Sequence, residues 1–126
     1  MSILFQSSDK FENDLKSFQA KDREKIISKI NFYCSGADVD PTLFRQHAYR
    51  PIQIFLPSDL KSSLYTLRIN KDLRVILTLE DDPLFDQTIV TLLRVVRHDS
   101  LEKAFRGIAG SLYHGQANLG KGDQNG

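Results

Sequence analysis

The chain has 126 residues, of which 40% are hydrophobic and 26% are charged, as is typical of one soluble globular domain. Its 17 Lys and Arg residues against 16 Asp and Glu residues give a net charge of +1. The chain as a whole therefore lacks the strong basic excess of many nucleic-acid-binding domains. Cys34 is the only cysteine, which excludes an intrachain disulfide and a metal site built from paired cysteines.

No targeting or membrane segment stands out in the sequence. Residues 1–6 lack the basic and long apolar stretches of a secretory signal. The longest apolar run, over residues 89–96, is interrupted by Arg94 and is too short to span a bilayer. We therefore expect a cytoplasmic protein with no membrane partner.

The first third of the chain predicts a strand and a helical hairpin. Ile3, Leu4 and Phe5 form a short apolar segment typical of an opening or edge strand. Ser8 is a candidate N-cap, because its side-chain oxygen can accept a free backbone N–H of a first helical turn. Helical spacing follows twice, in two stripes of residues separated by a short break: Phe11, Leu15 and Phe18, then Ile26, Ile27, Ile30, Tyr33 and Cys34.

Residues 36–63 are less regular, and prolines at 41, 51 and 57 interrupt them. Apolar side chains alternate over residues 52–56, which favours a short edge strand there.

The next segment predicts a β-hairpin whose register follows from its apolar pattern. Residues 64–69 and 73–79 read as strands, and the Asn-Lys-Asp sequence between them reads as a turn. A three-residue loop keeps the apolar side chains of both strands on one face and pairs Arg68 with Arg74 on the other, which we expect to be free of helices. Like charges directly opposite are unfavourable. The pair therefore either holds an anion such as phosphate or consists of two solvated side chains that splay apart.

The remaining segments complete the predicted fold. An acidic turn over residues 80–83 leads to residues 88–96, which are apolar on both faces and predict an interior strand. Ser100 is a candidate N-cap for a short closing helix that reaches Phe105.

This order of elements predicts an α+β fold, in which the N-terminal strand and helical hairpin pack on a mainly antiparallel sheet of about four strands. We expect one domain over residues 1–106. Six of the seven glycines lie in residues 107–126, which we expect to form a C-terminal extension with a flexible end.

The charges are segregated along the chain. Residues 45–74 hold six basic and two acidic side chains, whereas residues 80–86 hold four acidic side chains and no basic one. A basic segment suits a polyanion such as RNA. The candidate RNA-binding residues outside the paired arginines are Arg45, Arg50, Lys61 and Lys71.

Arg97 and His98 follow the last predicted strand. Histidine can act as a general acid or base near neutral pH. The other histidines, His47 and His114, show no ligand spacing with His98, so we expect no metal. Tyr49 and Tyr65 are candidates for stacking on bases, with a structural role as the alternative for each.

In the order and spacing of these motifs the chain resembles the RelE/ParE superfamily of toxins from bacterial toxin–antitoxin pairs. The resemblance covers residues 3–106. It rests on the opening strand, the helical segment FENDLK at residues 11–16, the hairpin LYTLRINKDLRVIL at residues 64–77, and the strand end VVRHD at residues 95–99.

The resemblance implies a RelE-like endonuclease that cuts messenger RNA on the ribosome without a metal or other cofactor, and that a small antitoxin protein holds inactive. By position, Arg68 and Arg74 match basic residues on the second and third strands, and Arg97 or His98 matches a basic or histidine position after the last strand. In the implied mechanism these cations stabilise charge at the phosphate while one residue moves protons.

The sequence departs from the family where many members carry a tyrosine on the closing helix, because Phe105 is the nearest aromatic residue and Tyr113 comes eight residues later. Two alternatives therefore stay open. One is a ParE-like inhibitor of DNA gyrase, and the other is a non-catalytic protein that keeps the fold for binding alone.

Overall fold

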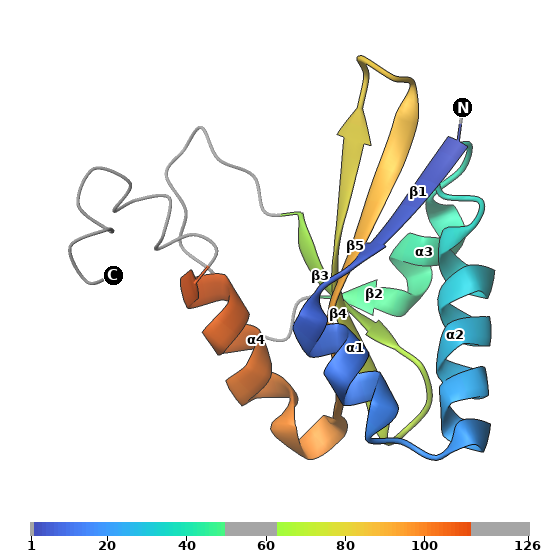
Figure 1. The fold of residues 1–126 in the computed structure, drawn as a ribbon. Helices are drawn as coiled ribbons and strands as arrows, with labels where there is room; N and C mark the ends of the chain where they lie inside the picture. Colours follow the sequence, from blue (N-terminus) through green and yellow to red (C-terminus); the bar gives the residue numbers. More distant parts are fainter. Residues whose placement is uncertain (1, 50–62, 112–126) are drawn as a thin grey trace.

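A computed structural model describes residues 2–49 and 63–111 of the chain. Five strands form one sheet in the order β1-β5-β4-β3-β2 (Figure 1). The elements along the chain are β1 (Ser2–Ser7), α1 (Asp9–Lys16), α2 (Ala20–Cys34), α3 (Thr42–His47), β2 (Ala48–Tyr49), β3 (Leu64–Arg68), β4 (Leu73–Asp82), β5 (Gln87–Arg97), the short 3-10 helix η1 (His98–Ser100) and α4 (Leu101–Ala109). The strand predicted over residues 52–56 lies outside the described residues.

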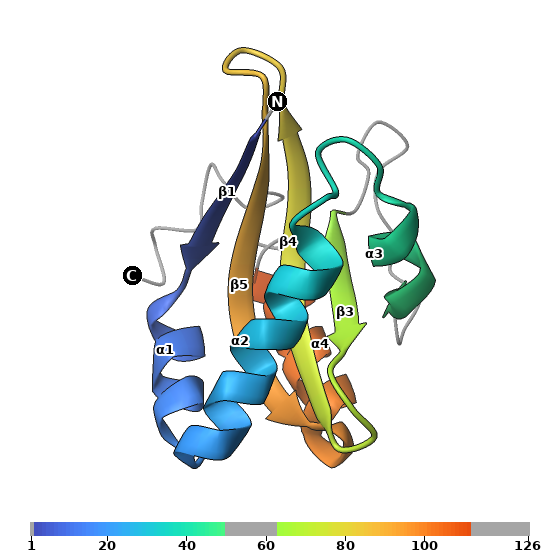
Figure 2. The ribbon, with the colours of Figure 1, turned by 90° about the vertical axis from the view of Figure 1, so that its right-hand side faces the viewer.

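The predicted α+β class with a mainly antiparallel sheet is confirmed. Strands β2 to β5 pair antiparallel, while β1 is an edge strand that pairs parallel with β5. Helices α1 and α2 cover one face of the sheet (Figure 2), and α4 lies on the other (Figure 1). The expectation that the face of Arg68 and Arg74 would be free of helices is therefore wrong. The closing helix folds back onto it because its apolar stripe needs a partner.

Each face of the sheet has its own apolar core. On the hairpin face, Ile26, Ile30 and Cys34 of α2 are buried at a spacing of four residues, which places them on one side of the helix. Ile27, which the sequence pattern assigned to the same stripe, is 40% exposed, so that assignment is wrong. On the α4 face, Leu101 and Phe105 are buried among residues of β3, β4 and β5.

The β3–β4 hairpin has the predicted register. Leu67 lies opposite Val75 and Arg68 lies opposite Arg74. The side-chain oxygen Oδ1 of Asn70 accepts backbone N–H groups from Asp72 (2.8 Å) and Leu73 (2.9 Å). An asparagine that bonds its own turn in this way favours the turn conformation over an extended one.

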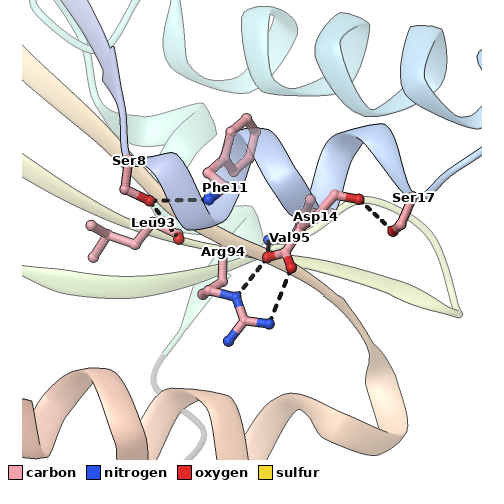
Figure 3. Close-up of polar contacts among 7 residues, drawn as sticks. All are labelled: Ser8, Phe11, Asp14, Ser17, Leu93, Arg94 and Val95. Atoms are coloured by element: carbon pink, nitrogen blue, oxygen red, sulfur yellow. Dashed lines mark hydrogen bonds and ion pairs between the residues drawn. The ribbon is translucent and has the colours of Figure 1, made fainter.

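Helix α1 takes over as the neighbour of β5 where β1 ends (Figure 3). Ser8 caps the helix by accepting the backbone N–H of Phe11, and its hydroxyl donates to the backbone oxygen of Leu93 at 2.9 Å. The carboxylate of Asp14 accepts the backbone N–H of Val95 at 3.1 Å and two hydrogen bonds from the Arg94 guanidinium, at 2.6 and 3.1 Å. These side chains satisfy polar backbone groups of β5 that no strand reaches.

A β-bulge in β5 lies within this contact. The register with β4 shifts between Ile76, which lies opposite Arg94, and Leu77, which lies opposite Leu92. The extra residue changes which side chains face each helix layer. Leu92 before the bulge and Val95 after it both belong to the hairpin-face core.

Helix α3 was not predicted from the sequence. Asp40 lies two residues before its first residue, Thr42, and one oxygen of the Asp40 carboxylate accepts both the backbone N–H and the hydroxyl of Thr42. These bonds lower the pKa of Asp40, with the side-chain bond as the larger cause. Phe44 anchors the helix in the core and is fully buried.

Two predicted boundaries differ from the structure. Strand β4 continues to Asp82, so the turn before β5 occupies residues 83–86 rather than 80–83, and Asp86 has a positive φ of 51°. Helix α4 continues through Gly107 and ends at Ala109. Within the described residues, every helix is too short or too polar to cross a bilayer.

Asp14→Ala should lower the free energy of unfolding by about 1–2 kcal/mol, because it leaves the Val95 N–H and the half-buried Arg94 without their acceptor. The exposed pair Glu102–Arg106 is the matched control, and Glu102→Ala should cost less than about 0.5 kcal/mol. Urea unfolding measures both. Equal losses for the two variants would contradict a special role for Asp14.

Burial raises the pKa of the Cys34 thiol from 9.0 to about 12. The folded state therefore holds this proton more tightly than the unfolded state. The resulting contribution to stability is fully present below pH 9 and is lost as the pH rises toward 12. Urea unfolding across this range should show a steeper loss of stability for the wild type than for Cys34→Ala, and parallel curves would contradict the prediction.

Candidate functional site

The candidate site lies on the α4 face, where β3 and β4 meet their connecting turn. Arg68 ends β3 and is exposed, whereas Arg74, directly opposite on β4, is buried with only 6% of its surface accessible. A buried arginine needs partners for its charged N–H groups. Those partners define the geometry of the site.

Two nitrogens of the Arg74 guanidinium are held in place. Nε donates to the hydroxyl of Tyr49 at 3.0 Å. Nη1 donates to the backbone oxygen of Asn70 and to that of Leu73, the latter at 3.1 Å. Two of the three guanidinium nitrogens, Nε and Nη1, therefore anchor the Arg74 side chain within the described residues.

The carbonyl of Asn70 explains how two arginines occupy opposite positions. It accepts Arg74 Nη1, and Arg68 Nε also points at it, at the long distance of 3.5 Å. A shared acceptor offsets part of the repulsion between the two cations. Arg74 is thus not one of two freely solvated arginines, which was one of the two alternatives left open by the sequence.

His98 lies next to this hairpin through the backbone. It opens η1 directly after β5, is exposed, and its backbone N–H donates to the Asp72 carbonyl at 2.7 Å. The pairing of Leu73 with Arg97 places the end of β5 beside the start of β4. The structure thereby brings His98 to the same end of the sheet as Arg68 and Arg74.

Arg97 is not brought together with Arg74. Its guanidinium carbon lies 5.4 Å from the centre of the Phe18 ring, on the face that α1 and α2 cover. The cation is placed to interact with the face of this ring.

The other predicted RNA-binding residues are dispersed. Lys71 is exposed in the β3–β4 turn, beside the two arginines. Arg45 is exposed on α3, which contacts α2 and lies on the hairpin side of the sheet (Figure 2). Arg50 and Lys61 lie outside the described residues.

Several solved structures are similar to this chain. A chain of the toxin–antitoxin complex RelBE2 from Mycobacterium tuberculosis is 13% identical, covers 78% of this chain and 100% of its own, and has a TM-score of 0.49. YafQ from E. coli is 15% identical over 78% of this chain and 96% of its own, with a TM-score of 0.44. A chain of the YoeB–YefM complex from Staphylococcus aureus is 24% identical over 78% of this chain and 99% of its own, with a TM-score of 0.43.

No protein-family model and no curated protein matches the chain.

Sequence reasoning did not connect Tyr49 with Arg74. The two are 25 positions apart, and β2, which carries Tyr49, has only two residues. No periodic pattern reports so short a strand. Phe105 is a residue of α4 that is fully buried against the sheet. Its side chain is the aromatic one nearest to the position where members of the resembled superfamily carry a tyrosine, and it has no hydroxyl.

In the part of the chain that the structure describes, no three His, Cys, Asp or Glu side chains group in a way that could hold a metal ion. The described site offers positive charges and a histidine that can transfer protons. One anchored guanidinium, two exposed cations and a histidine at the same end of the sheet suit a phosphate group.

Proposed function

We propose that this protein is the toxin of a toxin–antitoxin pair and that it cleaves messenger RNA on the ribosome without a metal. The observation that carries the proposal is Arg74, which three hydrogen bonds anchor at the same end of the sheet as the exposed Arg68 and Lys71. A small antitoxin protein is the proposed regulator.

The proposed reaction uses the 2′-hydroxyl of the RNA as the nucleophile. Its oxygen forms a bond to the adjacent phosphorus, the bond from phosphorus to the 5′-oxygen breaks, and a 2′,3′-cyclic phosphate and a 5′-hydroxyl result. His98 is the proposed group that accepts the 2′-hydroxyl proton. A water molecule gives a proton to the leaving 5′-oxygen, and the His98 imidazolium returns its proton to the hydroxide that remains, so the proton count balances. No redox partner is required.

Arg74 is suited to stabilise the additional negative charge on phosphorus in the transition state. Donors that are already oriented need no rearrangement when the charge develops, and they act more strongly where water is excluded. Three hydrogen bonds hold the side chain, and its burial lowers the local dielectric. Arg68 and Lys71, which are exposed, are suited to attract the RNA backbone in a salt-dependent way.

The charge distribution supports a defined orientation on RNA. The hairpin between β4 and β5 carries Glu80, Asp81, Asp82 and Asp86, and its tip projects at the opposite end of the sheet from the β3–β4 turn (Figure 1). A polyanion attracts the basic end and repels the acidic one.

A ParE-like gyrase inhibitor is the second candidate function. Among the described residues α4 carries no tyrosine, and Phe105 at the nearest position is a core residue, so the closing helix adds no hydroxyl to the site. That candidate predicts growth arrest with DNA damage and intact transcripts.

Induced expression in a bacterial host should arrest growth, and His98→Gln should reduce the rate of transcript cleavage by about 100-fold, the usual contribution of a general base. Arg74→Lys should reduce it by a similar or larger factor, because lysine keeps the charge and loses the three-point anchorage. Growth curves and quantitative transcript analysis measure both effects.

Arg106→Ala is the control, since Arg106 is an exposed arginine of α4 that pairs with Glu102. Thermal melting of each variant shows whether it is folded. Full toxicity of folded His98→Gln would exclude the proposed role of His98, and full toxicity of folded Arg74→Lys would exclude that of Arg74.

A further inference from the structure

We infer that Tyr49 orients Arg74 and also offers its ring to an unpaired nucleobase of the bound RNA. This inference rests on the proposed function and assigns a positioning and contact residue to the same site. The two parts of Tyr49 carry separate roles, the hydroxyl toward Arg74 and the ring toward the base.

The hydroxyl role follows from the bonds of Arg74. The backbone oxygens of Asn70 and Leu73 both accept from Nη1 and leave Nε without a backbone acceptor. Tyr49 Oη accepts from Nε at 3.0 Å and so holds the side of the guanidinium that these two carbonyls do not reach. Tyr49 is therefore a positioning residue for Arg74.

The hydroxyl of Thr66 does not compete for this role. Thr66 lies opposite Tyr49 in the β2–β3 pair, is fully buried, and its Oγ1 has no hydrogen-bond partner. Arg74 Nε bonds to the more exposed tyrosine instead. Removing the Tyr49 hydroxyl therefore takes away the acceptor of Arg74 Nε, and no other described residue accepts from this nitrogen.

The ring role follows from exposure. Tyr49 is 38% exposed although its backbone is paired in β2 and its hydroxyl is bonded to Arg74. A partly exposed tyrosine whose backbone and hydroxyl are both fixed loses little conformational entropy when a base stacks on its ring. Such stacking requires an unpaired base, because bases within a duplex already stack on their neighbours. A base on Tyr49 would adjoin a phosphate held at Arg74 in the proposed function.

The test uses the full chain with Tyr49→Phe, which keeps the ring, and Tyr49→Leu, which loses both ring and hydroxyl. Tyr33→Phe is the matched control, because Tyr33 lies on α2 and stacks on His47. The first readout is hydrogen exchange at Arg74 Nε by NMR, assigned with Arg74→Lys. Tyr49→Phe should speed this exchange at least tenfold, and Tyr33→Phe should leave it unchanged.

The second readout is fluorescence anisotropy with 2′-O-methyl octauridine, which cannot be cleaved, alone and annealed to its complement. The wild type should bind the single strand at least tenfold more tightly than the duplex. Tyr49→Phe should retain this binding within about threefold, and Tyr49→Leu should lose about tenfold, as expected for one stacked base.

Unchanged Nε exchange in Tyr49→Phe would overturn the positioning role. Wild-type affinity in Tyr49→Leu, or a wild type without preference for the single strand, would overturn the stacking role. The proposed function is decided separately by the growth and transcript assays on His98 and Arg74, so it can fail or stand independently of these results.

Discussion

The way α1 and the end of β5 are placed depends on the unequal lengths of two neighbouring strands, β1 and β5. Strand β1 ends at Ser7, opposite Leu92, whereas β5 continues to Arg97. The backbone of β5 beyond that point would face an empty edge, and α1 fills it with the hydroxyl of Ser8 and the carboxylate of Asp14. Unpaired strand edges are costly when they are covered, so these two side chains make the turn from strand to helix possible.

The same contact holds the bulge that directs the end of β5. Leu92 before the bulge and Val95 after it both belong to the hairpin-face core, and Val96 belongs to the core on the α4 face. The strand then delivers His98 beside Asp72 and lets α4 fold back over the second face. The position of the candidate site is thus linked to Asp14 through the bulge, although Asp14 belongs to another helix.

Several features were accessible from the sequence because they are local. The turn at Asn70 and the alternation around it determine the Arg68–Arg74 pairing, and the Ser8 cap depends on a side chain three residues from its partner. Other features depend on distant contacts. Helix α3 has six residues and is less than two turns long, and the parallel pairing of β1 has no local signal in the sequence. The bulge places the Arg97 side chain on the opposite face of the sheet from the one that regular alternation would give. The Tyr49–Arg74 bond needs the placement of a two-residue strand, which only the folded sheet supplies.

The central claim is that the basic end of the sheet performs phosphoryl transfer on RNA. The most direct measurement is the chemistry of transcript ends in cells arrested by the protein, with adaptor ligation that distinguishes 5′-hydroxyl from 5′-phosphate ends. The account predicts new 5′-hydroxyl ends within translated regions, which disappear when translation initiation is blocked. Growth arrest with intact transcripts, or with ends that carry a 5′-phosphate, would contradict it.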